Sequence, residues 1–194
     1  MFKKEDQYLL IERFARGKES QLIEKYIQDG PTAVQDELEL TDTEWQVIFD
    51  YLVFEHNLLY KCVSHSSEFF HDCYVKFGVA HVRSIIEVED KKYDKIFEVI
   101  FDYLAISLEG LNYHVMQNRE KYVMAFKVRG GDYIRTVLAL SKEKYQDQWM
   151  QILDVLLKLV CDDMFTEQNC EHSLNAFVHL FNINREHRII TKKS

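Results

Sequence analysis

The sequence predicts an α+β fold in which three tandem repeats, each a helix followed by a β-hairpin, form an antiparallel sheet with the helices on one face. Three observations favour this fold. The hexamer VIFDYL occurs at residues 47–52 and again at residues 99–104, an offset of 52 residues. A weaker copy, ILDVL, follows at residues 152–156, at the same offset. Behind each copy lies a segment of β-forming residues with a turn near its middle.

The first 40 residues are expected to form a helical segment that precedes the repeats. Apolar residues recur at helical spacing between residues 5 and 29. Gly30 and Pro31 end this pattern, because the residue before a proline is disfavoured in the α region. Pro31 is the only proline of the chain.

A helix is expected to begin each repeat. In the first repeat Thr41 and Glu44 have the spacing of a capping box, directly ahead of an apolar run. Apolar residues then follow at i, i+3, i+4 and i+7, which is typical of the core-facing side of a helix. These residues are Trp45, Ile48, Phe49 and Leu52, then Phe97, Ile100, Phe101 and Leu104, then Trp149, Ile152, Leu153 and Leu156.

The hairpin prediction depends on the middle repeat. Apolar and other residues alternate over residues 122–129, Gly130 and Gly131 form a turn, and residues 133–140 are rich in β-formers. Residues 70–89 and 174–191 have the corresponding place in the other two repeats. Their apolar residues also fit helical spacing, so a stack of helical repeats stays open as the alternative.

The chain is expected to fold as a single domain over residues 1–194, with an N-terminal helical segment at 1–40 and repeats at 41–92, 93–144 and 145–194. Charged residues make up 29% of the chain and there are six glycines. This composition is typical of an ordered globular protein with little linker.

One part of the chain resembles a known family. The order of elements over residues 95–165 is similar to that of type III secretion chaperones and related bacterial regulators. Leu111-Asn112, the predicted hairpin at Gly130-Gly131 and the helix ending at Asp162-Asp163 carry this resemblance. The resemblance implies a small α+β fold, from which the threefold repeat departs. A fold analogy does not supply a function.

Charge and motifs exclude several function classes. The formal net charge of −8 disfavours nucleic-acid binding, because that affinity depends on cations that neutralise phosphates. The chain contains no phosphate-binding glycine motif and no nucleophile elbow. The apolar run at residues 8–11 is too short for a signal peptide or a membrane span. With four cysteines in no CxxC pair, we expect a cytoplasmic protein with free thiols, no cofactor and no membrane partner.

Three residues are candidate metal ligands. Glu68 and His71 form an ExxH motif, which on a helix would place both side chains on one face. Di-iron bundles need this motif twice, and there is no second copy. His65, His71 and Cys73 nevertheless define an alternative function, a metal-dependent enzyme with a site around these side chains.

Two sets of charged residues recur among the repeats and lie outside the apolar, core-facing side of the helices. Asp50, Asp102 and Asp154 share one position of the repeated helix, about 150° from the centre of that apolar side. Arg83, Arg135 and Arg188 lie in the second predicted strand of each hairpin. These residues are interpreted either as structural ion pairs or as a row of charges that binds an extended partner.

The sequence as a whole predicts a non-enzymatic protein-binding module, that is, an adaptor, a chaperone-like factor or an inhibitor. Its binding surface would be acidic and rich in aromatic residues, which make up 13% of the chain. Such a surface would attract a basic protein partner. The oligomeric state is left open.

Overall fold

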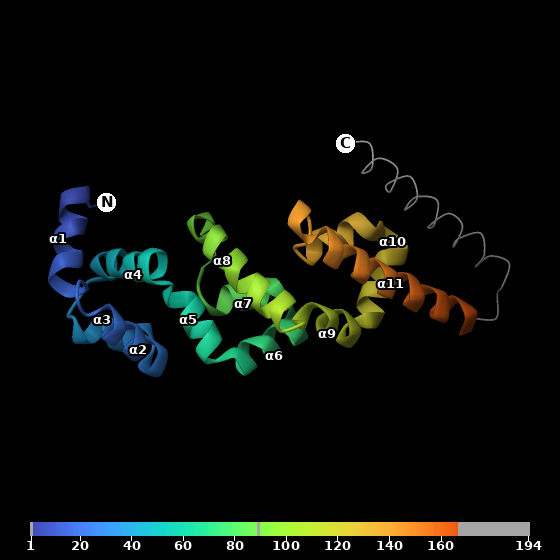
Figure 1. Ribbon diagram of the computed structural model, residues 1–194, viewed down its shortest axis with the longest axis horizontal. Coiled ribbons are helices and arrows are strands. Elements are labelled where there is room, and N and C mark those ends of the chain that lie inside the picture. The colour runs from blue at the N-terminus through green and yellow to red at the C-terminus, as the bar shows by residue number, and fades with distance from the viewer. Residues whose placement is uncertain (1, 89, 167–194) are drawn as a thin grey trace. The chain divides into compact units, whose positions relative to one another are not determined.

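The computed structural model describes residues 2–88 and 90–166, and the side chains up to residue 161. These residues form helices joined by short turns, and no strand occurs in this part of the chain (Figure 1). The predicted α+β fold, its hairpins and its antiparallel sheet are therefore wrong. The helical alternative is correct for the described residues.

The helices have the following bounds: α1 (Lys4–Phe14), α2 (Glu19–Asp29), α3 (Pro31–Glu37), α4 (Asp42–His56), α5 (Leu58–His65), α6 (Ser67–Phe77), α7 (Val79–Ile85), α8 (Asp94–Phe101), α9 (Gly110–Gln117), α10 (Arg119–Val137) and α11 (Gln146–Thr166). Two short 3₁₀ turns, η1 (Lys91–Tyr93) and η3 (Glu143–Tyr145), precede α8 and α11, and a π-helical segment, η2 (Asp102–Ser107), follows α8.

The predicted helix start at Thr41 is confirmed. The Thr41 hydroxyl accepts a hydrogen bond from the Glu44 backbone N–H, and the Glu44 carboxylate accepts one from the Thr41 backbone N–H at 3.0 Å. This reciprocal pairing satisfies two of the N–H groups that a helix start leaves without intrahelical partners. The sequence therefore located the beginning of α4 correctly.

A kinked helix pair occurs three times in the part of the chain that the structure describes, as α2–α3, α6–α7 and the two halves of α10. A glycine with positive φ makes each kink: Gly30 at 87°, Gly78 at 86° and Gly130 at 77°. At Gly30 and Gly130 ψ is near 180°, a backbone conformation that is almost exclusive to glycine. Gly130, which was predicted to lie in a hairpin turn, is therefore a helix kink.

Each kinked pair also ends in the same way. A non-glycine residue with φ between 51° and 58° closes the last turn, and the backbone N–H of the following residue donates to a carbonyl five residues back. The closing residues are Glu39, Glu87 and Ala139, and the donated bonds are Leu40 to Gln35, Val88 to Arg83 and Leu140 to Arg135.

The interval between equivalent positions explains where the chain differs from a strict repeat. Gly78 and Gly130 are 52 residues apart, but Gly30 and Gly78 are 48 apart. The first copy passes almost directly from α3 into α4, whereas η1 and η3 add a 3₁₀ turn before α8 and α11. That three-residue turn and one more connecting residue account for the four extra residues.

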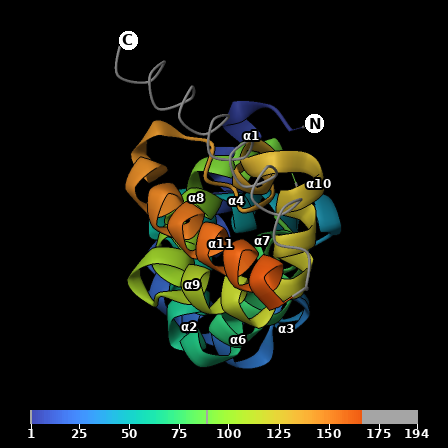
Figure 2. The ribbon, with the colours of Figure 1, turned by 90° about the vertical axis from the view of Figure 1, so that its right-hand side faces the viewer.

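The chain divides into two compact units. Among the described residues, unit 1 comprises 2–72, 80–88 and 90–108, and unit 2 comprises 73–79 and 109–166. In unit 1, α1 packs against α4, α2 packs against α3, α4 and α5, and α5 packs against α8. In unit 2, α10 packs against α9 and α11, and α10 and α11 lie side by side in Figure 2.

The repeated apolar residues that were predicted to face the core are mostly buried. Ile48, Ile100 and Ile152 are 0% exposed, and Leu52, Leu104 and Leu156 are at most 1% exposed. Trp45 and Phe49 are only half-buried, so the first copy is less enclosed. The predicted core positions of the second and third copies are confirmed.

Candidate functional site

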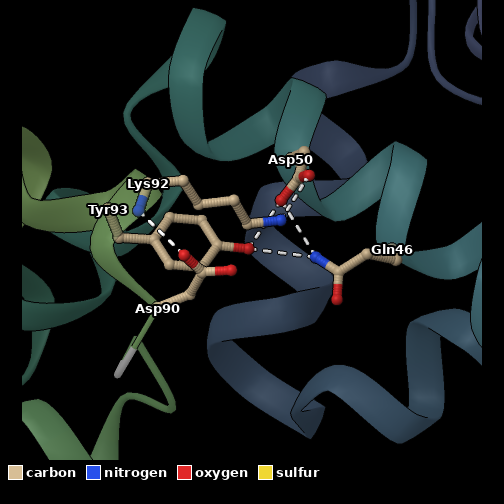
Figure 3. Close-up of polar contacts among 5 residues, drawn as sticks. All are labelled: Gln46, Asp50, Asp90, Lys92 and Tyr93. Carbon is tan, nitrogen blue, oxygen red and sulfur yellow. Dashed lines mark hydrogen bonds and ion pairs between the residues drawn. The ribbon is translucent and has the colours of Figure 1, made fainter.

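Asp50 lies in a polar cluster that joins α4 to η1 (Figure 3). One carboxylate oxygen accepts hydrogen bonds from the Tyr93 hydroxyl at 2.6 Å and from the Gln46 amide at 2.9 Å. The other oxygen pairs with the Lys92 ammonium at 2.7 Å. The Asp90 carboxylate caps η1 by accepting from the backbone N–H of Lys92 at 2.9 Å.

The Asp50 cluster is built on a buried aromatic ring. Tyr93 is 3% exposed, and its ring stacks on Phe54 with 5.6 Å between ring centroids. Burial raises the pKa of the Tyr93 hydroxyl, and its hydrogen bond to Asp50 adds to that rise. A neutral hydroxyl donating to a carboxylate is a stable arrangement at neutral pH, so Asp50 holds η1 against α4. Its predicted role in partner binding stays a prediction.

The other two repeated aspartates occupy different environments. Asp102 is half-buried at the start of η2, and Asp154 is exposed on α11. Asp50 and Asp102 are thus alike in burial, and Asp154 differs from both. A role of the three aspartates in binding an extended partner stays a prediction.

The repeated arginines close the kinked helix pairs. Arg83 Nε donates to the Val88 carbonyl at 3.0 Å, and Arg135 Nε donates to the Leu140 carbonyl at 2.9 Å. Each guanidinium also contacts the first turn of the next helix. Arg83 pairs with the Asp94 carboxylate, and Arg135 donates to the Gln146 side-chain oxygen at 2.8 Å. Both arginines therefore tie one helix end to the next helix start.

The first copy uses an amide for the same purpose. Gln35 Nε2 donates to the Leu40 carbonyl at 3.2 Å and to the Asp42 carboxylate at 2.9 Å. The predicted strand location of Arg83 and Arg135 is wrong, because both lie near the ends of helices. Arg188, the third predicted arginine, lies outside the described residues.

Replacing Arg135 with methionine is expected to lower the free energy of unfolding by about 1–3 kcal/mol, the range for losing hydrogen bonds from a charged donor. Methionine keeps much of the apolar stem, so the loss reports the guanidinium. Urea denaturation measures it. Arg119→Met is the matched control, because Arg119 is exposed at the other end of α10. Equal losses in the two variants would contradict the proposed capping role.

The candidate metal ligands are not assembled into a site. His65 is exposed at the end of α5, whereas His71 and Cys73 are half-buried on α6. Among the described residues, no group of three or more His, Cys, Asp or Glu side chains is placed to hold a metal ion. The structure therefore gives no support to the alternative of a metal-dependent enzyme.

A buried histidine in unit 2 escaped the sequence analysis. His114, on α9, is 4% exposed and, apart from tyrosine and tryptophan, is the one buried polar side chain among the described residues. Its Nδ1 lies 2.7 Å from the Val75 carbonyl, and its Nε2 lies 2.7 Å from the Tyr122 hydroxyl. A carbonyl accepts but does not donate, so Nδ1 carries the proton and Nε2 accepts from Tyr122. His114 thereby caps the C-terminal end of α6.

Burial lowers the pKa of His114 below its ordinary value of 6.5. The backbone hydrogen bond to Val75 opposes this shift, and the charge of Lys121 adds to it. The unfolded chain therefore binds a proton at a higher pH than the folded chain does. The stabilising effect of the neutral imidazole is complete above about pH 6.5 and declines as the pH falls below that value.

The His114→Gln variant is expected to lose less stability than the unchanged chain when the pH falls from 7.5 to 5. The reason is that glutamine takes up no proton on unfolding. Urea denaturation at both pH values measures the two differences. The control is His65→Gln, which removes an exposed imidazole. If His114→Gln and the unchanged chain lost equal stability, the neutral buried imidazole would be ruled out as a source of pH dependence.

The N-terminal half of α10 carries apolar side chains on both of its faces. Tyr122, Val123 and Phe126 are buried, at 2%, 7% and 0% exposure. Met124 and Val128 are exposed, at 59% and 76%. At about 100° per residue, Met124 and Val128 lie on the side of the helix opposite the buried residues. Packing within unit 2 therefore does not require these two apolar side chains.

Basic side chains outnumber acidic ones around this exposed apolar pair, where Glu120 is the one acidic residue of the same half of α10. Lys121 and Arg129 are exposed, and the Arg129 guanidinium lies 4.6 Å from the centroid of the Tyr133 ring. Beyond the kink, Tyr133 and Val137 are 38% and 39% exposed. The helix carries five basic residues (Arg119, Lys121, Lys127, Arg129 and Arg135) against two acidic ones (Glu120 and Asp132). We call Lys121, Met124, Val128 and Arg129 the α10 face.

The α10 face differs in charge from the chain as a whole, whose formal net charge is −8. Its residues were visible in the sequence, where Met124 and Val128 contributed to the apparent alternation of a strand. Reading that stretch as a helix with apolar residues on two opposite faces would have identified them.

The described helices include none that is both long and apolar enough to cross a membrane. Cys62 and Cys73 are free thiols. Comparison with known proteins identifies no relative, because no family model, no curated protein and no solved structure matches this chain. The resemblance to type III secretion chaperones stays a prediction.

Proposed function

We propose that this chain is a non-enzymatic protein-binding module, an adaptor or chaperone-like factor built from repeated helix pairs. The observation that carries the proposal is the exposure of Met124 and Val128 on the solvent side of α10. Exposed apolar side chains scattered singly are normal on a protein surface. Two that follow each other at i and i+4, opposite the core and bordered by charged side chains that are mostly basic, have the pattern of an interface centre with a polar rim.

Two further features support this proposal. Helical repeats present extended surfaces made of successive helices, which suits the recognition of another chain. The repeated arginines and Asp50 have partners within the fold, so these charged residues contribute to the scaffold. A cytoplasmic setting belongs to the proposal, and the free thiols of Cys62 and Cys73 support it.

The proposal is tested by capture of partners from an extract of the native source, with the full chain as bait and an unrelated protein of similar size and charge as control. Proteins identified by mass spectrometry on the bait alone are then purified and titrated against the chain by calorimetry. We expect at least one saturable complex with a dissociation constant in the micromolar range or below. If no purified candidate binds saturably, the proposed function is wrong.

A further inference from the structure

We infer that the α10 face binds an acidic, amphipathic segment of a partner protein, a segment that places apolar side chains against Met124 and Val128 and carboxylates near Lys121 and Arg129. The inference rests on the proposed function and adds the site and the chemistry of the partner. The proposed partner segment is acidic, whereas the net charge of the chain suggests a basic partner. The charge of the surface that makes contact decides which partner is attracted.

The centre of the face requires an apolar ligand. Val128 is the most exposed large apolar side chain of the described residues, at 76%, and Met124 follows it one helical turn earlier at 59%. Methionine has an unbranched, polarisable side chain that adapts its shape to different apolar partners. An occupant that covers both side chains removes apolar surface from water, which is the main source of binding energy at such a site.

The border of the face requires an anionic ligand. At about 100° per residue, Lys121 lies in line with Met124 and Val128 on the solvent side, and Arg129 lies about 100° around the helix from Val128. Glu120 precedes Met124 by one turn, so the border is mixed in sign with an excess of cations. Lys121 and Arg129 are both exposed. The Arg129 guanidinium stacks on Tyr133, an arrangement that keeps its charge while fixing its position beside the apolar pair. Carboxylates placed against these two cations would be attracted and would set the register of the bound segment.

Other anionic occupants fit the α10 face less well. A nucleic acid would be expected to use basic residues together with aromatic rings that stack on its bases, whereas the centre of this face is aliphatic. An anionic membrane would favour a helix with bulky apolar residues along its whole length. Here the two exposed apolar side chains of α10 span one helical turn. An amphipathic helix of the partner could cover them with one pair of apolar residues at i and i+4.

The test begins with a phage library of random 16-residue peptides selected on the immobilised full chain. We expect the enriched peptides to be rich in Asp and Glu and to carry apolar residues at helical spacing. A synthetic enriched peptide is then titrated against variants of the chain. Met124→Gln combined with Val128→Gln is expected to weaken binding at least about tenfold, as is usual when anchor residues of an interface lose their apolar contact.

A charge variant and a control complete the series. Lys121→Gln combined with Arg129→Gln is expected to weaken binding and to reduce its dependence on salt between 50 and 500 mM NaCl. Val99→Gln changes a 52% exposed valine on α8 in unit 1 and is expected to leave binding within about twofold. Circular dichroism establishes that each variant remains helical, which is expected because all five positions are exposed.

Several outcomes would overturn the inference. These are enrichment of neutral or basic peptides, absence of any enriched peptide, or binding that is unchanged by the Met124 and Val128 variant. Tighter binding of a 20-base-pair DNA duplex, or of vesicles of phosphatidylcholine and phosphatidylserine at 3:1, would assign the face to those ligands instead. If a captured native partner binds the double variant unchanged, the proposed function stands and the α10 inference falls.

Discussion

Replacing Ile152 with alanine is expected to destabilise the protein by about 2–5 kcal/mol, the range for losing a buried isoleucine side chain down to its Cβ. Ile152 is 0% exposed on α11, which packs against α10 in unit 2. The loss combines the transfer free energy of three carbon atoms with the cavity that they leave. Domains of this size are stable by only about 5–15 kcal/mol, so the effect is a large share of the total.

Urea denaturation of the Ile152→Ala variant measures this loss. The matched control is Gln151→Ala, which changes the adjacent, exposed residue of the same helix and is expected to alter the free energy of unfolding by no more than about 0.5 kcal/mol. An Ile152→Ala variant as stable as the control would show that α11 is not part of the core.

The same reasoning applies to the repeated hexamer. Ile48 and Ile100 occupy the corresponding positions and are also 0% exposed. The letters that recur at these positions therefore reflect the core, and their repetition is explained by packing. Asp50, the polar member of the hexamer, holds η1 through Lys92 and Tyr93. In the first copy, the aspartate at this repeated position therefore has a structural role.

Local signals in the sequence identified helix starts and core positions well. The Thr41 and Glu44 capping box and the apolar stripe with period 3.6 depend on contacts within one or two turns, which a sequence contains directly. The long-range partners of Asp50 and of the arginines could not be predicted in this way. Their bonds depend on which turn follows the helix, and the 3₁₀ turns have no strong sequence signal.

The hairpin prediction failed for a specific physical reason. In the stretch from Tyr122 to Val128 the core residues and the exposed apolar residues together produce an alternation that a strand would also show. A helix with one apolar face would have revealed its period. Gly130 added a second misleading signal, since a glycine with positive φ kinks a helix as readily as it turns a hairpin. Two of the residues that misled the assignment, Met124 and Val128, form the centre of the α10 face.

His114 shows a different limit of sequence analysis. The residue 52 positions earlier is Cys62, so the repeat does not mark the position as special. What makes His114 notable is its burial between the Val75 carbonyl and the Tyr122 hydroxyl, two groups 47 residues apart along the chain. Such a site becomes apparent only when the helices that supply its parts are placed in space.

Replacing Gly78 with alanine is expected to cost more stability than the same change at Gly130. Both glycines have positive φ, 86° and 77°, and forcing alanine into such a conformation costs about 1–3 kcal/mol at either position. At Gly78 the added Cβ would also lie 3.2 Å from Cε1 and Nε2 of His114. Among the described residues, none lies within 4 Å of a Cβ added at Gly130.

The contact with His114 decides the difference, because the imidazole has little freedom to move. Both of its nitrogens are engaged at 2.7 Å, so a shift away from the new methyl group lengthens or breaks a buried hydrogen bond. A bond left unmade in a buried site costs about 1–3 kcal/mol, which is the expected excess of Gly78→Ala over Gly130→Ala in urea denaturation.

A second background isolates the cause of this excess. In a chain that already carries His114→Ala, the imidazole is absent, so Gly78→Ala retains only its backbone cost. The excess of Gly78→Ala over Gly130→Ala is then expected to fall by about 1–3 kcal/mol, the cost assigned to the crowded imidazole. If the excess persisted in the His114→Ala background, the crowding at Gly78 would have to come from the backbone of the kink itself, and His114 would not be the residue that limits what can replace this glycine.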